Sequence, residues 1–546
     1  MNVDFDKRKR VTNAVLFESI LESFSWRKSQ EQFMEWVKKP LDAGKKFIIL
    51  EEPPGTGKSL LSQLYIQYYK ETFSKNAKFD LLTCTKNLQQ QYLDTFPYLY
   101  NLWGKSNYRC DTYDNSCEYG KTCNTTKGAE PCEGCPHTKS VSRWLDGDVS
   151  LTNFHIHGLM SIFNKEMMET RNSDVLIVDE CHTLEPTING FVSFKLTKKV
   201  WSKFVSDEKS GVWNNDVFSL ETIDELAEWI EKEFMPEMEN SKKILNSKSG
   251  RLSGKKLEDN IKTISELDGL VGSIGKFLTD FKLKISEWVI DKKYDESGSM
   301  LWEIQPLWTG EIMKKNLWDG YKNVFLMSGT IIDPHMFCQV NGIPIDDVAF
   351  LRLGSPFPKE NRPIYYYPQG KMTYRNKEET WKNYIPAIKK ILKKYKGKKG
   401  IIHCGNYELW EWIKRDIKDD RLIFASTSDR QQSLDSHINS TTDTVIVSPS
   451  MKQGVDLKDD LSRFQLILKM PYPSLASKVN KKRVETKPKW YPWMTVMDVI
   501  QSYGRSIRSD KDYADTIILD QCFSDVMVQQ EQMLPKYFKE VIKKIK

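Results

Sequence analysis

A glycine-rich turn near the N-terminus has the residue types of a phosphate-binding loop. It lies between Lys46–Leu50, an apolar run typical of a buried strand, and a helical pattern that begins at Leu60. At such a junction, glycines let backbone N–H groups surround phosphates, a lysine reaches the β and γ oxygens, and a serine hydroxyl holds Mg²⁺. The motif lacks the first glycine of the full Walker pattern, so a plain turn is the alternative. The predicted ATP-binding residues here are Pro54, Gly55, Thr56, Gly57, Lys58 and Ser59.

A second apolar run ends in the acidic residues that a P-loop requires. Asp174–Val178 has the pattern of a buried strand, and Asp179, Glu180 and His182 follow it. We expect Asp179 to hold Mg²⁺ through water and Glu180 to act as general base toward the attacking water. We expect His182 to couple the nucleotide site to the neighbouring domain. An acidic pair at a strand end is common, but together with a P-loop it predicts a catalytic centre.

Two residues upstream of the loop could recognise the base of the nucleotide. Arg27 and Gln30 stand at the start of an amphipathic helical pattern that leads into the P-loop strand. Their side chains could hydrogen-bond an adenine ring. A solvated helix start explains the same residues equally well, and both interpretations stay open.

The second half of the chain repeats an alternation of strands and helices. Asn323–Ile331 is an apolar run that ends in small hydroxyl residues, which suits a junction sensing the nucleotide state. From about Asn361, predicted strands and a helix follow one another: Lys399–Gly405, Asn406–Ile417, Leu422–Ala425 and Thr444–Ser450. Such alternation predicts a second parallel sheet, so the fold class is α/β.

A pair of arginines near the C-terminal end could complete the nucleotide site from a second domain. Arg505 and Arg508 are three residues apart and therefore share one helix face. Two guanidiniums on one face can bind a γ-phosphate across a cleft, as arginine fingers do. A solvated basic face is the alternative, and the accompanying Gln501 and Gly504 favour the functional one. We also assign Asp456 and Gln501 to the nucleotide site.

Composition limits the class of protein. A chain of 546 residues exceeds a single hydrophobic core, and we expect at least three compact units. Apolar residues make up 39% and charged residues 28%, with no apolar run long enough for a membrane span, and no targeting signal is visible in Met1–Arg10. We therefore expect a cytoplasmic protein, bacterial or phage-like. The net charge of +7 is compatible with a polyanion partner without requiring one.

These motifs, in this order, resemble those of superfamily 2 helicases, and within them the XPD/DinG type. The matching stretches are Gly55–Ser59, Leu82–Gln89, Asp179–His182, Met327–Thr330, Gln453–Asp456 and Gln501–Arg508. In addition, Leu102–Cys110 resembles the family's entry into its iron-sulfur domain, and the stretch from Cys135 resembles its exit. The acidic box has Cys181 where the family usually has alanine, and Ser59 stands where threonine is common.

The resemblance implies two RecA-like motor domains with an iron-sulfur insert and a helical arch insert in the first. It implies an ATP-dependent DNA helicase that moves 5′ to 3′ on single-stranded DNA and unwinds forked duplexes or DNA-RNA hybrids; we expect a monomer. A translocase or remodelling clamp that moves without processive unwinding is the alternative. The expected first motor domain comprises residues 1–105, 141–190 and 306–335; the cluster insert is 106–140, the arch 191–305 and the second motor domain 336–546.

Five of the ten cysteines fall between Cys110 and Cys135, which indicates a local set of metal ligands rather than disulfides. The resemblance implies a [4Fe-4S] cluster held by Cys110, Cys117, Cys123 and Cys135. The competing tetrad uses Cys132 in a Cys-x-x-Cys pair with Cys135, at the expense of one inner cysteine. Zinc is the alternative metal, because thiolate tetrads bind it readily.

The predictions for the helical segment and for the DNA contacts are less specific. Helical patterns dominate from Phe191 to about Glu303, and the charged stretch Asn240–Lys256 has the composition of a loop. We expect strand-end hydroxyl and amide residues to contact DNA phosphates, which would make binding independent of sequence. These candidates are Thr85, Lys86, Asn153, Ser328, Ser448 and Ser450.

Overall fold

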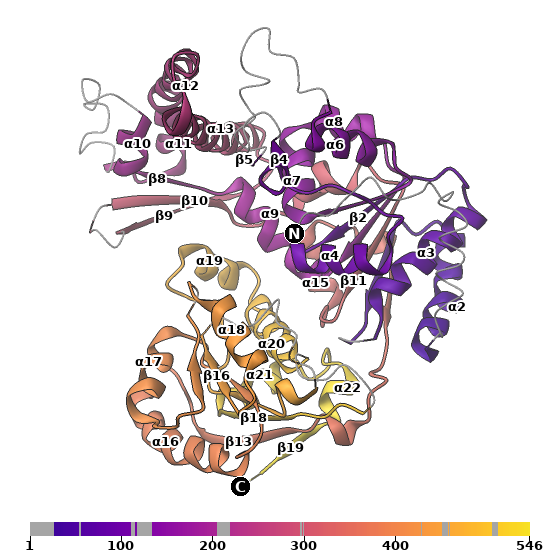
Figure 1. The fold of residues 1–546 in the computed structure, drawn as a ribbon, viewed down its shortest axis with the longest axis vertical. Helices are drawn as coiled ribbons and strands as arrows, with labels where there is room; N and C mark the ends of the chain where they lie inside the picture. Colours follow the sequence, from indigo (N-terminus) through magenta and orange to yellow (C-terminus); the bar gives the residue numbers. More distant parts are fainter. Residues whose placement is uncertain are drawn as a thin grey trace.

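The computed structural model describes residues 27–53, 56–110, 115–116, 134–204, 219–294, 298, 300–426, 428–449, 457, 459–504 and 511–545. Two parallel sheets of seven strands each form a first and a second lobe within these residues (Figure 1). The α/β class and the two predicted sheets are therefore confirmed. Several predicted site residues lie outside the described ones: Pro54, Gly55, Cys117, Cys123, Cys132, Ser450, Asp456, Arg505 and Arg508.

The first sheet has the strand order β12-β1-β11-β7-β2-β6-β3 with every pair parallel. Its strands are β1 (Phe47–Glu51), β2 (Phe79–Thr83), β3 (Tyr100–Asn101), β6 (Val149–Asn153), β7 (Val175–Asp179), β11 (Asn323–Ser328) and β12 (Val348–Arg352). Its helices are α2 (Lys28–Asp42), α3 (Lys58–Thr72), α4 (Lys86–Thr95), α6 (Pro136–Asp146), α7 (Phe154–Phe163), α8 (Lys165–Arg171), α9 (Leu184–Val192), α14 (Gly310–Met313) and α15 (Pro334–Asn341).

Alternation along the central strands gives this sheet a core on each face. Ile48 and Leu50 of β1 pack in one apolar cluster with α2 and α3, while Phe47 and Ile49 pack in another on the opposite face. Because successive side chains of a strand point to opposite faces, a continuous apolar run is what a sheet covered on both faces requires. The carboxyl ends of β1 and β7, which carry the P-loop and the acidic box, are thereby brought to one edge.

A buried ion pair cross-links the strands and helices of the first lobe. Asp80 on β2 and Arg171 on α8 are both fully buried, and Arg171 Nε lies 3.0 Å from Asp80 Oδ1. Tyr321 OH donates to the other oxygen of Asp80 at 2.7 Å, and His157 Nε2 lies 2.8 Å from that hydroxyl. Arg171 also donates to two main-chain carbonyls at the C-terminal end of α6. The network therefore fixes α6 against the sheet.

Removing the carboxylate from this network should destabilise the first lobe strongly. Asp80→Ala leaves the Arg171 guanidinium buried without its counterion, which costs about 3–5 kcal/mol of the free energy of unfolding. Chemical denaturation measures the loss. Asp146→Ala, at the exposed end of α6, is the matched control and should change that free energy by less than about 0.5 kcal/mol. Equal losses in the two variants would contradict the role of the buried pair.

The second sheet has the order β15-β16-β14-β17-β18-β13-β19, again with every pair parallel. Its strands are β13 (Ile364–Gly370), β14 (Gly400–His403), β15 (Leu422–Phe424), β16 (Val445–Ser448), β17 (Phe464–Ile467), β18 (Asp515–Asp520) and β19 (Ile542–Lys544). Its helices are α16 (Lys377–Lys394), α17 (Tyr407–Asp416), α18 (Arg430–Asn439), α19 (Lys478–Thr486), α20 (Trp490–Tyr503), α21 (Cys522–Gln529) and α22 (Lys536–Lys539).

The predicted boundary between the lobes at residue 336 is wrong. β12 pairs in parallel with β1 of the first sheet, with Val348 opposite Phe47, so the first lobe extends to Arg352. α15 also belongs to this lobe, where it packs against α14. The apolar pattern of β12 carries no signal of which sheet it joins, because strand pairing is decided by neighbours distant in sequence.

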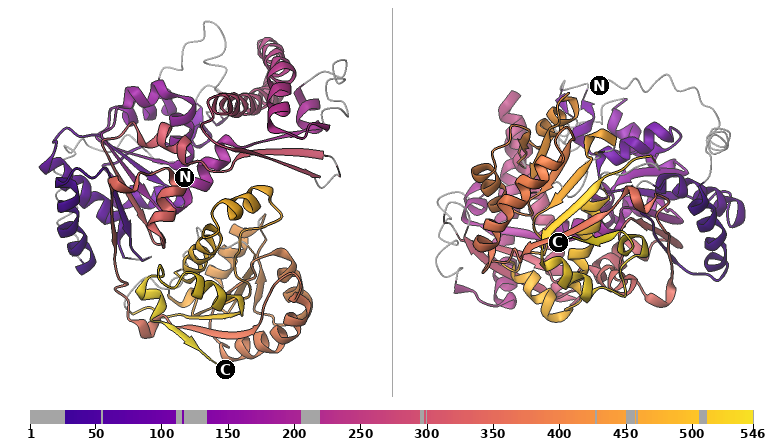
Figure 2. Two further views of the ribbon diagram at one scale, coloured as in Figure 1. Left: turned by 180° about the vertical axis from the view of Figure 1, so that it is seen from behind. Right: turned by 90° about the horizontal axis from the view of Figure 1, so that it is seen from below.

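The segment between α9 and α14 forms a small layer of its own. It contains the antiparallel strands β8 (Phe194–Thr197), β9 (Trp288–Tyr294) and β10 (Met300–Pro306) and the helices α10 (Lys198–Phe204), α11 (Ile223–Trp229), α12 (Met235–Ser249) and α13 (Gly254–Lys282). A π-helical turn, Ile230–Phe234, joins α11 to α12. Seen from behind, α12 and α13 project from the first lobe (Figure 2).

One expectation for this segment is confirmed and another is wrong. Helices dominate it as predicted, but the three-stranded sheet was not predicted, although β10 alternates between buried and partly buried side chains as a strand does. The predicted loop Asn240–Lys256 is instead mostly helix, and the turn between α12 and α13 is confined to residues 250–253. Asn260 Nδ2 donates to Leu245 O at 3.0 Å and so ties the two helices together, a contact that composition does not reveal. Among the described residues, no helix is long and apolar enough to cross a membrane.

Candidate nucleotide site between the two lobes

The P-loop meets the start of α3 in the geometry that anion binding needs. Gly57, the residue before α3, has a φ of 102°, a left-handed conformation that favours glycine. A Cβ there would lie 2.6 Å from Gln30 Nε2, so a larger residue would also clash. Thr56 Oγ1 donates to Pro53 O at 2.6 Å and braces the loop. No side chain caps the start of α3, and a helix N-terminus of this kind attracts an anion.

The predicted lysine and acidic box converge at the carboxyl ends of β1 and β7. Lys58 Nζ lies 3.6 Å from Glu180 Oε1, and His182 Nδ1 lies 3.4 Å from Glu180 Oε2. His182 Nδ1 is also 2.8 Å from Ser328 Oγ, at the end of β11. Glu180 therefore sits between the P-loop cation and the histidine. Its backbone φ of 56° is left-handed, which is uncommon for a residue with a side chain.

Asp179 is held by the backbone of Glu180 and by a tyrosine that the sequence did not single out. Tyr92 OH, on α4, donates to Asp179 Oδ2 at 3.0 Å, and Glu180 N donates to Asp179 Oδ1 at 2.9 Å. Burial, together with the neighbouring Glu180 charge, raises the pKa of Asp179 to about 6. A divalent cation would offset that cost, because it favours the ionised form. Tyr92 lies 87 residues before Asp179 in the sequence, so no local motif identifies this tyrosine as part of the site.

A further acid was overlooked. Glu52 precedes the loop, is fully buried, and has a pKa raised to about 7 by burial, against the opposing effect of Lys58. Its neighbour Glu51 is also buried, with its pKa raised to about 7 by burial, and pairs with Arg352 at 2.8 Å. The sequence signal for both was available, because two glutamates at the end of an apolar strand are unusual.

Of the two candidate base-recognition residues, Gln30 contacts the P-loop and Arg27 lies at the surface. Gln30 is buried and its Nε2 lies 3.5 Å from Thr56 O, while its Oε1 accepts from Arg27 N at 2.9 Å. Gln30 is thus in contact with the P-loop. Arg27 begins the described chain at the surface, as the start of α2. The hypothesis of a solvated helix start therefore does not fit Gln30.

The second lobe reaches this site through α20. Gln501 Nε2 donates to Thr330 Oγ1 at 2.7 Å, and Trp493 Nε1 donates to Ile331 O at 2.8 Å. A hollow lies at the same junction, with Pro53 from the P-loop strand on one side and Tyr503 and Gly504 from the end of α20 on the other. Gly504 immediately precedes the predicted arginine pair, which lies outside the described residues.

The Thr330–Gln501 contact predicts a measurable coupling between the lobes. Thr330→Val removes the hydroxyl that accepts from a buried amide, and an unpaired buried donor costs about 1–3 kcal/mol of stability. Thermal melting measures the loss. In a double-mutant cycle, Gln501→Leu combined with Thr330→Val should recover most of it, because neither polar group then remains. Additive losses in the double variant would contradict a direct contact.

A second interlobe contact is charged and buried. Arg483 of α19 donates to Glu185 Oε1 of α9 at 2.8 Å and to Leu307 O at 2.7 Å. Its guanidinium also lies 4.9 Å from the centre of the Trp308 ring. Both charged side chains are nearly inaccessible, 9% for Arg483 and 7% for Glu185. Because α9 follows the acidic box directly, this contact ties the box to the second lobe.

The predicted phosphate contacts separate into surface and buried groups. Lys86 is exposed at the start of α4, with its Nζ donating to Asn107 at 2.9 Å, whereas Thr85 is half-buried and its hydroxyl caps α4 by accepting from Leu88 N at 3.2 Å. Asn153 is instead buried as the N-cap of α7. Ser328 and Ser448 are buried as well, and Ser328 contacts His182. The expectation that these three side chains reach DNA is therefore wrong, because strand-end hydroxyl and amide groups also serve as internal caps.

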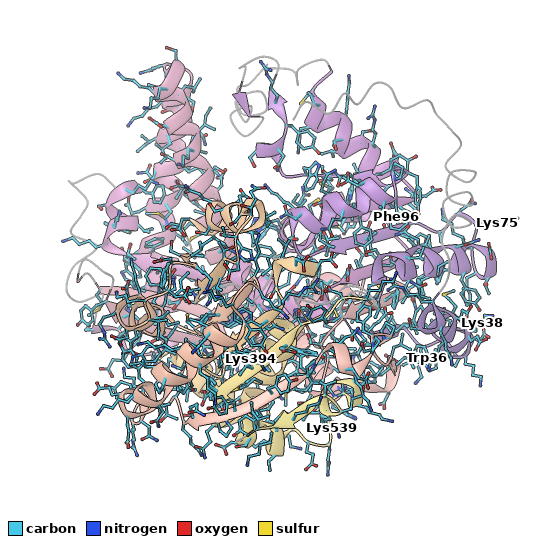
Figure 3. The ribbon with its side chains drawn as sticks, turned by 60° about the horizontal axis from the view of Figure 1, so that its bottom comes forward. Trp36, Lys38, Lys75, Phe96, Lys394 and Lys539 are labelled. Atoms are coloured by element: carbon cyan, nitrogen blue, oxygen red, sulfur yellow. The ribbon has the colours of Figure 1, made fainter. Side chains whose placement is uncertain are left out.

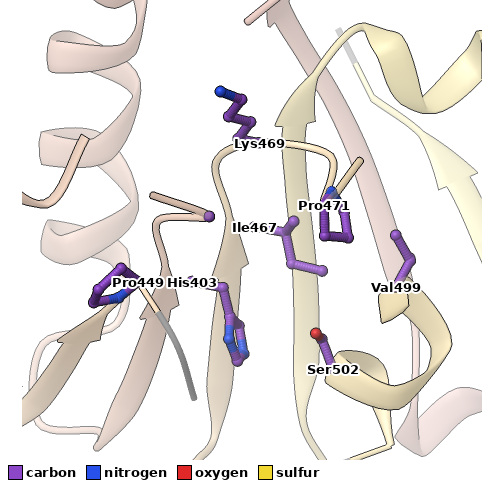
Figure 4. A pocket seen from close by; sticks show the side chains of 8 residues that line it. His403, Pro449, Ile467, Lys469, Pro471, Val499 and Ser502 are labelled. Atoms are coloured by element: carbon purple, nitrogen blue, oxygen red, sulfur yellow. The ribbon is translucent and has the colours of Figure 1, made fainter. Parts of the chain in front are cut away.

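A shallow hollow lies at the carboxyl ends of β14, β16 and β17 (Figure 4). His403 and Ser502 point into it in the close-up, whereas Lys469 stands at its outer rim. Gly405, with a φ of +82°, and Pro449 shape the backbone around it. Ligands of parallel sheets bind outside the carboxyl ends of the strands, so this edge is the second lobe's candidate binding edge.

The ends of the cysteine segment lie side by side. Tyr108, two residues before Cys110, packs its ring 5.3 Å from the His137 ring, and its hydroxyl is 2.7 Å from Ser140 Oγ. Cys135 is the N-cap of α6 and is half-buried. The side chain of Cys110 and the three cysteines between these two lie outside the described residues.

Comparison with known proteins agrees with this architecture. A model of a helicase C-terminal domain matches residues 388–541, and a model of the res subunit of type III restriction enzymes matches residues 23–204. The ATP-dependent DNA helicase DinG of Photobacterium profundum is 23% identical, over 54% of this chain and 48% of its own length. The chain thus matches about half the length of this relative.

Solved structures resemble the whole described fold. A structure titled as an XPD helicase has a TM-score of 0.63 at 17% identity, and it covers 95% of this chain and 100% of that one. The structure of S. tokodaii Xpd4 has a TM-score of 0.57 at 13% identity with the same coverage. At these identities the likeness concerns the fold. Together with the ordered motifs and the sequence matches, it shows what the chain is similar to, namely helicases of the XPD and DinG type.

Proposed function

We propose that this protein is an ATP-driven DNA helicase that moves along single-stranded DNA, 5′ to 3′, and separates duplexes. One observation carries the proposal. Lys58 meets Glu180 in the first lobe, and the same box is linked through Ser328 and Thr330 to Gln501 of the second lobe. A site shared by two lobes couples ATP turnover to their relative movement. The named activity of the DinG relative supports the same function.

The residues of the site fit a magnesium-bound triphosphate. The uncapped start of α3 and Lys58 would bind the phosphate oxygens, while Ser59 and Asp179 would hold the metal. A metal held there would supply positive charge against the developing negative charge of the phosphate. Glu180 would accept a proton from the attacking water. The change in the charge of Glu180 would then affect His182 beside it, and through His182 the contact with Ser328 at the end of β11. We assign the γ-phosphate contact from the second lobe to Arg505 and Arg508.

The proposed DNA path crosses the edges of both sheets. Thr85 and Lys86 follow the carboxyl end of β2 in the first lobe, and the hollow beside Gly405 lies at the carboxyl ends of strands in the second. Phosphate contacts at these edges would be independent of base sequence. We assign residues 191–305 as the family's arch, because their helices project from the first lobe (Figure 1).

Tailed duplexes test the function and its polarity. Strand displacement is measured on one duplex with a 5′ single-stranded tail and on another with a 3′ tail, at saturating ATP. We expect displacement of the 5′-tailed substrate alone and stimulation of ATP hydrolysis by single-stranded DNA. Stimulation without displacement would favour the translocating clamp, and neither effect would contradict a DNA motor altogether.

We also propose that the cysteine segment holds a [4Fe-4S] cluster through Cys110, Cys117, Cys123 and Cys135. The contact of Tyr108 with Ser140 supports it, because it holds the two ends of the segment together, as outer ligands require. A metal would stabilise a segment too short to bury its own core.

Metal content tests the ligand set directly. We expect the purified protein to be brown, with stoichiometric iron and sulfide, and Cys135→Ser to lose both. Cys132→Ser is the control and should retain them. Loss of iron in both variants would assign Cys132 to the tetrad instead. Stoichiometric zinc in anaerobically prepared protein would contradict the cluster.

A further inference from the structure

A cluster of lysines covers two tyrosine rings on the second lobe. Lys394 Nζ lies 5.5 Å from the centre of the Tyr365 ring, and Lys390 Nζ lies 5.8 Å from that of Tyr367. Lys543, near the C-terminus, places its Nζ 5.9 Å from the same Tyr365 ring. We call these five residues the lysine–tyrosine face. Segments separated by about 150 residues thus bring three ammonium groups to one surface.

The regular geometry of two strands and one helix brings these side chains together. Tyr365 and Tyr367 are two apart on β13 and therefore share one face, and Lys543 of β19 is the register partner of Tyr365. Lys390 and Lys394 are four apart on α16, so they lie one above the other on the same side of the helix. The arrangement is therefore a property of regular elements and does not depend on a loop.

The face concentrates positive charge without internal compensation. None of its lysines forms an ion pair with a carboxylate in the described part of the chain. Like charges at i and i+4 on a helix repel each other and destabilise it, and the rings beneath offset part of this cost. The same helix and the turn after it carry further exposed lysines: Lys389, Lys393, Lys396 and Lys398. Asp515, the nearby acid, accepts a hydrogen bond from Tyr395.

The face lies away from the motor cleft. α16, β13 and β19 form the end of the second lobe that is remote from the first lobe (Figure 1). Lys394 is seen on this end when it is brought forward (Figure 3). A ligand bound here would therefore not compete with ATP or with a strand crossing the carboxyl ends of the sheets.

We propose that the lysine–tyrosine face binds the phosphate backbone of duplex DNA outside the motor cleft. Lys390 and Lys394 are one helical turn apart, about 6 Å, which suits successive charges of a polyanion. Single-stranded DNA would need aromatic faces for base stacking, but these rings are covered by ammonium groups. Duplex DNA needs only its backbone to be contacted. The face would hold the duplex arm while the cleft engages the single strand.

Binding without ATP tests the proposal, so its outcome is independent of motor activity. The triple variant Lys390→Gln, Lys394→Gln, Lys543→Gln removes three charges. Fluorescence anisotropy would measure the affinity for a blunt duplex and for single-stranded DNA over a range of salt concentrations. For the duplex, we expect the log–log salt slope to become shallower by about 2.7 and affinity near 0.1 M salt to fall at least about tenfold. Affinity for single-stranded DNA should change less than about twofold.

The matched control is the variant Lys38→Gln, Lys39→Gln, Lys75→Gln, which removes the same charge from exposed positions of the first lobe. It should leave the duplex slope unchanged. Thermal melting should show that the face variant is as stable as the parent or more so, since repulsion is relieved. An unchanged duplex slope would overturn the proposal, and so would an equal loss for single-stranded DNA. Polyglutamate serves as a third probe, a mimic of an acidic protein. If the face variant bound duplex DNA like the parent but no longer bound polyglutamate, the proposal would be overturned and the face assigned to an acidic protein.

Discussion

Lys58→Ala should lower the turnover number for ATP by about 10²–10³-fold while leaving the affinity for single-stranded DNA within about threefold. The Lys58 ammonium group lies 3.6 Å from Glu180, the proposed general base, at the start of α3. Without it, charge that develops on the transferred phosphoryl group loses its nearest protein donor. Steady-state phosphate release and anisotropy measure the two quantities.

Lys70→Ala is the matched control for this change. Lys70 lies on the same helix but at its C-terminal end, where it pairs with Asp148 at 3.1 Å. It should leave both the turnover number and DNA affinity close to those of the parent. A Lys58→Ala protein that hydrolyses ATP within tenfold of the parent rate would remove the P-loop assignment.

Glu180→Gln should abolish hydrolysis but retain nucleotide. The amide keeps the shape of the side chain yet cannot accept a proton, so the turnover number should fall by about 10²–10⁴-fold. The affinity for ATP should stay within about threefold, because the phosphate-binding groups of α3 are untouched. Single-turnover hydrolysis and equilibrium binding of a fluorescent ATP analogue measure the two effects.

Glu169→Gln, on the exposed surface of α8, makes the same chemical change away from the site and should be silent. If Glu180→Gln lost nucleotide affinity and turnover in equal proportion, the carboxylate would serve binding rather than proton transfer. Parental turnover in Glu180→Gln would assign the general base to another group.

The sequence was sufficient for the features that local pattern determines. The continuous apolar runs of β1 and β7 located the strands, and the residues after them located the P-loop and the acidic box, because parallel strands end at one edge. The same reasoning failed for Ser328 and Asn153, which occupy strand ends but serve as internal hydrogen-bond partners. A residue type at a strand end does not reveal whether its side chain turns outward.

Contacts between segments far apart in the chain could not be predicted from the sequence. Tyr92 approaches Asp179 across 87 residues, and Arg483 approaches Glu185 across 298. No periodicity records such proximity, because it depends on how helices pack against the sheets. The pairing of β12 with β1 was missed for the same reason.

The buried Arg483–Glu185 pair limits how the lobes can move apart. Pulling them straight apart would break this ion pair together with the hydrogen bond from Arg483 to Leu307 O. Rotation about this pair, with opening at the P-loop side, would keep the two charges together and break the neutral contacts around Gln501. We therefore expect the second lobe to turn about the Arg483–Glu185 pair with each turnover rather than to move straight away from the first lobe.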